Sequence, residues 1–76
     1  MTGPFEVVWS DQATEDWLRL AFADAEAVAR AVRRFAEGRG GTVVYVEGEM
    51  RLFVGAHVVV LLADGDTLHV DRVRRA

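Results

Sequence analysis

The sequence predicts an α+β fold of two layers, in which two helices pack on one face of a largely antiparallel sheet. Three observations support this prediction. Residues 11–37 place apolar side chains at helical spacing, whereas residues 42–73 form short runs rich in Val, Leu and aromatic side chains. Gly-containing turns divide the second region into four strands, and a short alternating segment precedes the helices. The predicted order is therefore strand, helix, helix and a four-strand antiparallel meander.

The length and charge of the chain limit what it can be. Its 76 residues are expected to form one domain, residues 1–76. A domain of this size buries only about 60% of its unfolded surface, so a homodimer contact or a bound protein would add stability. The formal net charge of −3 argues against a basic grip on nucleic acid over the whole surface. Arg72, Arg74 and Arg75 still form a local basic group.

The sequence carries no signal for a membrane or an oxidising compartment. It has no cysteine, and residues 1–8 contain Glu6 where a signal peptide would have a basic start. The apolar run His57–Ala63 is too short to cross a bilayer. We therefore expect a cytoplasmic protein without membrane contact.

The N-terminal part predicts a strand and then a helix. The segment Phe5–Trp9 alternates as a strand does. Ser10 is a favourable N-cap for a helix from Asp11 to about Ala23. Apolar residues at helical spacing would face the sheet: Ala13, Trp17, Leu20 and Ala21.

A second helix is predicted over Ala25–Glu37, with Asp24 as its N-cap. Gly38 is placed to end it in a left-handed conformation. Its buried stripe would be Val28, Ala29, Val32, Phe35 and Ala36.

The meander consists of four predicted strands and three tight turns. The strands are Val43–Val46, Glu49–Val54, His57–Leu62 and Thr67–Val73. The turns are Glu47-Gly48, Gly55-Ala56 and Asp64-Gly65.

If each turn has two residues, the register assigns every side chain to one face of the sheet. The helix-facing set is Val43, Tyr45, Met50, Leu52, Val54, Val59, Leu61, Leu68 and Val70, with His57 and Arg72 at its edge. The outward set is Val44, Val46, Glu49, Arg51, Phe53, Val58, Val60, Leu62, Thr67, His69, Asp71 and Val73. Two helices cannot cover both faces, and the outward set is too apolar for simple exposure to water. We therefore predict a surface for a protein partner or a second copy at Val44, Phe53, Val58, Val60 and Leu62.

Two groups of polar residues are candidates for chemistry. The register places Arg51 and His69 on either side of Val60, where a bridging phosphate would meet a cation and a general acid or base. The alternative is an ordinary wet face on which both residues pair with Glu49 or Asp71.

The second group is a corner where His57 faces Arg72, with Arg74 and Arg75 nearby. It either binds an anion or is a solvated strand end. The two histidines fall on opposite faces, so no metal site is expected. The glycines between the second helix and the meander are in the wrong order for a phosphate loop, and no cofactor is implied.

The order of elements and three short motifs resemble the RelE/ParE superfamily of bacterial toxin components. The motifs are Val7-Val8-Trp9-Ser10-Asp11-Gln12-Ala13, Gly48-Glu49-Met50-Arg51-Leu52-Phe53-Val54-Gly55, and Asp71-Arg72-Val73-Arg74-Arg75. The resemblance implies an antitoxin-like protein partner and basic side chains on the concave sheet face that bind a scissile phosphate. It gives Arg51, His69, Arg72 and Arg74 as the catalytic candidates. The pattern is degenerate, because Phe53 and Val58 stand where further cations are expected and no tail aromatic follows Arg75.

Two functions remain open. The chain is either the toxin component of a toxin–antitoxin pair, acting on translation by mRNA cleavage or on a topoisomerase, or a non-catalytic module of the same fold that binds a protein or dimerises. The first implies RNA as a possible ligand, and the second does not.

Overall fold

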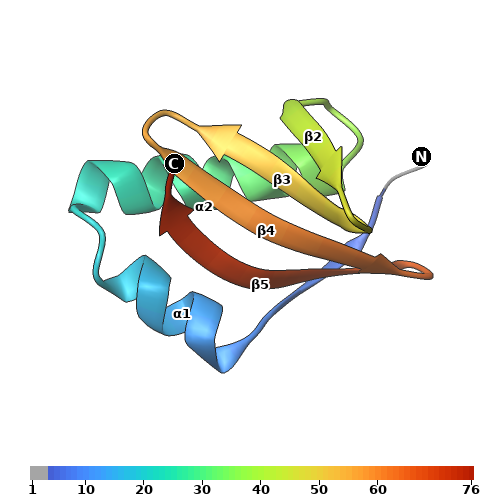
Figure 1. Ribbon diagram of the computed structural model, residues 1–76, viewed down its shortest axis with the longest axis horizontal. Coiled ribbons are helices and arrows are strands. Elements are labelled where there is room, and N and C mark those ends of the chain that lie inside the picture. Colours follow the sequence, from blue (N-terminus) through green and yellow to red (C-terminus); the bar gives the residue numbers. More distant parts are fainter. Residues whose placement is uncertain (1–3) are drawn as a thin grey trace.

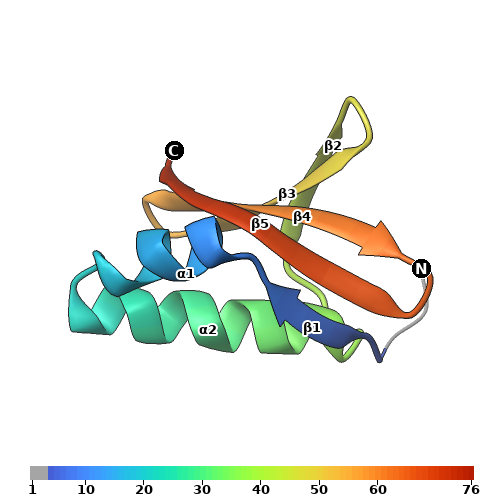
Figure 2. The same ribbon diagram turned by 90° about the horizontal axis from the view of Figure 1, so that it is seen from below.

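The computed structural model describes residues 4–76, and these residues form two layers (Figures 1 and 2). The elements in chain order are β1 (Glu6–Trp9), α1 (Asp11–Leu18), α2 (Phe22–Ala36), β2 (Thr42–Val46), β3 (Glu49–Val54), β4 (His57–Asp64) and β5 (Thr67–Arg75). The strands form a five-stranded sheet in the order β1-β5-β4-β3-β2. β1 runs parallel to β5, and the other neighbours are antiparallel. The predicted α+β architecture is confirmed.

The core lies between the sheet and the two helices. α2 contributes Val28 and Val32, which meet Leu52, Leu61 and Leu68 from the strands, and all five side chains are almost completely buried. Burying one such side chain contributes about 1.5–3 kcal/mol, so this layer is the main source of stability. The helix-facing residues predicted for the central strands, Met50, Leu52, Val59, Leu61, Leu68 and Val70, are all in this core.

Both helix boundaries differ from the prediction at the α1–α2 connection. α1 ends at Leu18 and not near Ala23, and α2 begins at Phe22 with Ala21 as its N-cap. Asp24 is therefore in the first turn of α2, where its charge suits the helix dipole, and is not the cap. Ala21 has no side-chain oxygen to cap with, so the sequence carried no signal for this start.

The hairpin turns position the outer part of the sheet. The predicted turns Glu47-Gly48 and Gly55-Ala56 are confirmed, but the third turn is Gly65-Asp66, because Asp64 pairs with Thr67. Glu47 and Gly48 both have positive φ, 50° and 82°, as a tight hairpin with the natural strand twist requires. Tyr45, predicted to face the core, is 66% exposed because this hairpin extends beyond the helices (Figure 2).

A bulge in β5 changes the faces of its last residues. Leu61 pairs with Val70, but Val60 pairs with Arg72, so Asp71 is an extra residue. One extra residue moves every following side chain to the opposite face. Val73, predicted to face outward, is in the core, and Arg72, predicted at the edge of the core face, faces outward.

Candidate functional site

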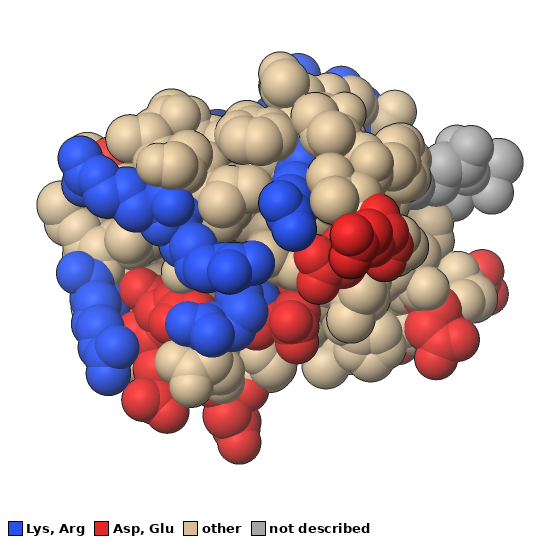
Figure 3. Space-filling model, viewed as in Figure 1, with Lys and Arg blue, Asp and Glu red and all other residues tan. Residues whose placement is uncertain are grey.

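The face of the sheet away from the helices carries a group of arginines. Val60 lies between Arg51 on β3 and Arg72 on β5, which places these two arginines about 10 Å apart across two strand spacings. Arg74 is the next residue of β5 on this face, opposite Val58. We call Arg51, Arg72 and Arg74 the arginine face. Figure 3 looks onto this side and shows basic side chains gathered there with acidic groups beside them.

Neither predicted polar pair has the predicted geometry. His69 lies opposite Leu62, so it is not the neighbour of Val60 and does not face Arg51 across it. His57 is buried and pairs with Arg75, so the predicted corner between His57 and Arg72 does not form. Both errors have the same cause: the third turn lies one residue later than predicted, and β5 contains the bulge at Asp71. As a result Arg72, and not His69, lies opposite Val60.

Arg51 has hydrogen-bonding capacity to spare. Its Nη2 donates to Glu49 Oε1 at 3.4 Å. Its Nε is buried and has no acceptor among residues 4–76.

A hollow of about 330 Å³ lies beside Arg51. Its lining is Arg51, Phe53, Val58, Arg74, Arg75 and Ala76. Phe53 is 40% exposed, so an aromatic ring stands next to guanidinium groups. Guanidinium forks bind phosphate oxygens, and an exposed aromatic ring stacks on a nucleobase. The hollow therefore combines the two contacts that a nucleotide needs.

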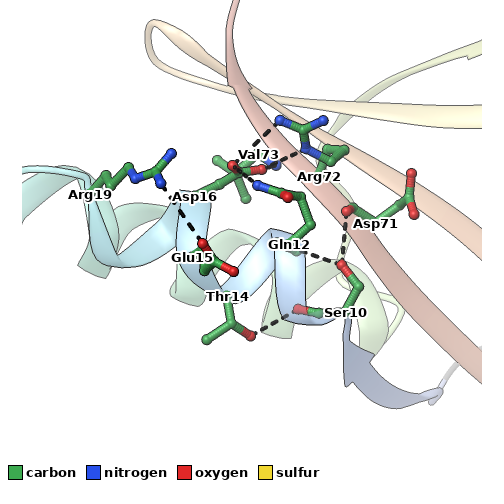
Figure 4. Close-up of polar contacts among 10 residues, drawn as sticks. Ser10, Gln12, Thr14, Glu15, Asp16, Arg19, Asp71, Arg72 and Val73 are labelled. Carbon is green, nitrogen blue, oxygen red and sulfur yellow. Dashed lines mark hydrogen bonds and ion pairs between the residues drawn. The ribbon is translucent and has the colours of Figure 1, made fainter.

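Arg72 is held in place by α1 (Figure 4). Its Nε donates to Asp16 Oδ2 at 2.8 Å, and its Nη2 donates to Asp16 Oδ1 at 3.5 Å. Asp16 Oδ2 also accepts from the backbone N–H of Val73 at 3.0 Å, and Gln12 donates to Oδ1 at 3.1 Å. These hydrogen bonds, that from Arg72 first, lower the pKa of Asp16 to about 2 against the opposing effect of burial. No local sequence pattern indicates this pair, because its members lie 56 positions apart.

Ser10 joins the same edge of the sheet to α1. Its Oγ accepts from the N–H of Ala13 at 2.9 Å, as an N-cap does, and donates to the carbonyl of Asp71 at 2.9 Å. The predicted cap is therefore confirmed, and it has a second contact with the bulge. Ser10 and Asp16 together fix the part of β5 that carries Arg72 and Arg74.

The predicted apolar partner surface is only partly available. Val44, Phe53 and Leu62 are exposed, and Val58 is half-buried. Val60 is completely buried, so it is not a contact residue. Arg51 and Arg72 flank it, and the aliphatic stems of arginines cover apolar surface in this way. The outer face is thus a cationic centre with apolar residues around it.

The helix side has a second hollow that the sequence did not indicate. This hollow has a volume of about 410 Å³ and is lined by Trp9, Thr14, Trp17 and Ala29. The rings of Trp9 and Trp17 meet edge to face, with 6.1 Å between their centroids. Trp17 Nε1 donates to the carbonyl of Ala25 at 2.7 Å, which ties α1 to α2.

Two kinds of feature are not found in residues 4–76. No group of three His, Asp or Glu side chains lies close enough to hold a metal ion. None of the helices described is long and apolar enough to span a membrane.

Comparison with known proteins places the fold. No protein-family model matches the sequence, and a sequence comparison with curated proteins gives no match. Among solved structures, the chromosomal ParDE toxin–antitoxin system of P. aeruginosa is similar with a TM-score of 0.76 at 13% identity, covering 96% of this chain and 97% of that one. The RelBE2 toxin–antitoxin complex of Mycobacterium tuberculosis gives 0.73 at 21% identity, covering 96% and 99%.

A third solved structure is similar over most of the chain. The RelB–RelE antitoxin–toxin complex of Methanococcus jannaschii gives a TM-score of 0.76 at 12% identity, covering 90% of this chain and 88% of that chain. These likenesses extend over nearly the whole chain, and they show a RelE/ParE-like fold. At such low identities they show the fold alone.

Proposed function

We propose that this chain is the toxin component of a toxin–antitoxin pair and that its arginine face binds the phosphates of RNA. The observation that carries the proposal is the grouping of Arg51, Arg72 and Arg74 on the uncovered face of a RelE/ParE-like sheet. Guanidinium groups on a face that residues 4–76 leave open are the chemistry that a phosphate backbone requires. The neighbours' toxin–antitoxin complexes support the same assignment.

The proposed chemistry is cleavage of an RNA strand by its own 2′-hydroxyl. This reaction needs a base, an acid and cations that stabilise charge on the phosphate. Arg51, Arg72 and Arg74 would supply the cations. Glu49, whose carboxylate accepts a hydrogen bond from Arg51, is the candidate base, and His69 on the same face is the candidate acid. Of the two targets, we propose mRNA and not a topoisomerase, because Phe53 offers a stacking surface for a nucleobase beside the arginines.

The proposed protein partner is an antitoxin that covers the outer face. The exposed apolar residues Val44, Phe53 and Leu62 surround the arginine face. Exposed apolar patches of this kind are typical of partner surfaces. A segment bound to them would shield the arginines, so binding and neutralisation would occur together.

Expression of the chain alone in a bacterial host tests the proposal. We expect growth to stop, and we expect the double variant Arg51→Ala/Arg74→Ala to restore growth at equal protein level. Arg30→Ala is the matched control, because Arg30 pairs with Glu26 on the exposed surface of α2. Growth arrest that persists in the double variant, or no arrest by the wild-type chain, would contradict the proposal.

A non-catalytic protein-binding module is the second candidate. It is favoured by the pairing of Arg72 with Asp16, which already occupies one of the three cations. It is also favoured by the position of His69 opposite Leu62, which is two residues along β4 from Val60, the residue that Arg51 and Arg72 flank. This candidate predicts normal growth and no RNA cleavage. It also predicts that Phe53→Asp abolishes binding to the partner while Arg51→Ala leaves it intact.

A further inference from the structure

The sheet has one edge that nothing in the described chain covers. β2 is the last strand in the order, and it pairs with β3 alone. An edge strand presents a row of unpaired N–H and C=O groups to any strand that approaches. Figure 2 shows the β2–β3 hairpin standing away from both helices, so an approaching strand would meet no obstacle from them.

β2 lacks the features that protect edge strands from pairing. Its sequence is Thr-Val-Val-Tyr-Val, with no charged residue and no proline. Natural edges are commonly blocked by an inward-pointing charge, a proline or a bulge. β-Branched and aromatic residues instead favour strand pairing. The composition of β2 therefore favours pairing with a further strand.

The charges at the two ends of β2 favour a second copy of the same chain. Arg39 precedes the strand and Glu47 follows it, and both are exposed. Arg39 also lies 3.6 Å from Glu37, in an exposed pair that contributes little. In an antiparallel arrangement, the start of one β2 lies beside the end of the other. When the two copies of Val44 lie opposite each other, Glu47 of one copy lies beside Gly41 of the other. Arg39 comes two positions before Gly41, so its long side chain would reach Glu47 along the diagonal of the pair.

We propose that β2 pairs antiparallel with β2 of a second copy, about a two-fold axis at Val44. Val43 would face Tyr45 of the other copy, and Thr42 would face Val46. Aromatic and β-branched residues directly opposite each other stabilise an antiparallel pair. The two sheets would join into one, with all helices on one side and both arginine faces on the other. This proposal is independent of the toxin assignment.

The first test measures the mass of the purified chain by sedimentation equilibrium. We expect a concentration-dependent dimer for the wild-type chain. Val44→Lys would place two like charges opposite each other at the two-fold axis and weaken association by about ten-fold or more. Val44→Thr keeps a neutral β-branched residue and is expected to dimerise as the wild type does. A wild-type monomer at all concentrations, or a dimer unaffected by Val44→Lys, would overturn the proposal.

A charge-swap experiment tests the antiparallel register. Arg39→Glu and Glu47→Arg should each weaken self-association, because each homodimer then brings like charges together. Mixing the two variants should restore a dimer, since both contacts in the mixed pair again join opposite charges. Circular dichroism checks that each variant is folded. Failure of the mixture to associate better than either variant alone would contradict this register.

Discussion

The two edges of the sheet are finished in different ways. Where β1 ends at Trp9, α1 continues along β5 and supplies side chains to its backbone, with Ser10 on the carbonyl of Asp71 and Asp16 on the N–H of Val73. At the other edge, β2 has no such neighbour in the described part of the chain. The edge that α1 contacts, which we call the closed edge, positions the arginine face. The β2 edge, which we call the open edge, has no neighbouring strand beyond β3 among residues 4–76. Substitutions at the two edges should therefore have very different costs.

The largest effect is expected at Asp16. Asp16→Ala removes the acceptor of the Val73 N–H and leaves that buried backbone donor unsatisfied, which should lower the free energy of unfolding by about 2–3 kcal/mol. Urea denaturation measures the change. Asp16→Asn is the matched control, because it retains an oxygen acceptor and should lose less. Equal stability of the wild type and Asp16→Ala would show that α1 does not close this edge.

The pH dependence of stability should come partly from the same carboxylate. The pKa of Asp16 is about 2 in the folded chain, below its ordinary value of 3.8, so the folded state binds the proton less tightly than the unfolded state does. Its stabilising contribution is complete above pH 3.8 and disappears as the pH falls toward 2. As the pH falls from 3.8 to 2, the free energy of unfolding should therefore decrease more for the wild type than for Asp16→Asn. Urea denaturation at a series of pH values measures it. Parallel pH profiles for the two proteins would contradict the lowered pKa.

A smaller effect is expected at Ser10. Ser10→Ala removes both the N-cap of α1 and the hydrogen bond to Asp71, at a cost of about 1 kcal/mol or slightly more. Thermal unfolding measures it. Ser10→Thr keeps the hydroxyl and should recover most of the loss. A Ser10→Ala variant with unchanged melting temperature would mean that the cap does not secure the bulge.

The smallest effect is expected at the open edge. Tyr45 is 66% exposed, so Tyr45→Thr should change monomer stability by less than about 0.5 kcal/mol. Urea denaturation of a dilute sample, in which any dimer is dissociated, measures this directly. A loss as large as that at Asp16 would erase the contrast between the two edges.

Local pattern predicted most of the fold. Alternation and Gly-containing turns located the strands of the meander, and the N-cap at Ser10 located the start of α1. These signals are local, because each depends on residues within a few positions of one another. The start of α2 was missed for the same reason, since Ala21 offers no capping side chain to recognise.

The arrangement of the arginine face could not be predicted, because it depends on contacts between β5 and distant parts of the chain. The bulge at Asp71 is favoured by burial of Val73 in the core and by capture of its N–H by Asp16, and both are contacts with distant parts of the chain. Without the bulge, the alternation in β5 assigns Arg72 to the wrong face. Arg51 was placed on the correct face because its hairpins carry no bulge.

The measurement that tests the central claim most directly is the binding of a short single-stranded RNA, followed by fluorescence anisotropy at two salt concentrations. The arginine face predicts salt-dependent binding by the wild-type chain and a loss of about ten-fold or more in Arg51→Ala/Arg74→Ala. Arg30→Ala on α2 should bind as the wild type does. Equal affinity of the wild type and the double variant would contradict the claim that Arg51 and Arg74 form a phosphate site.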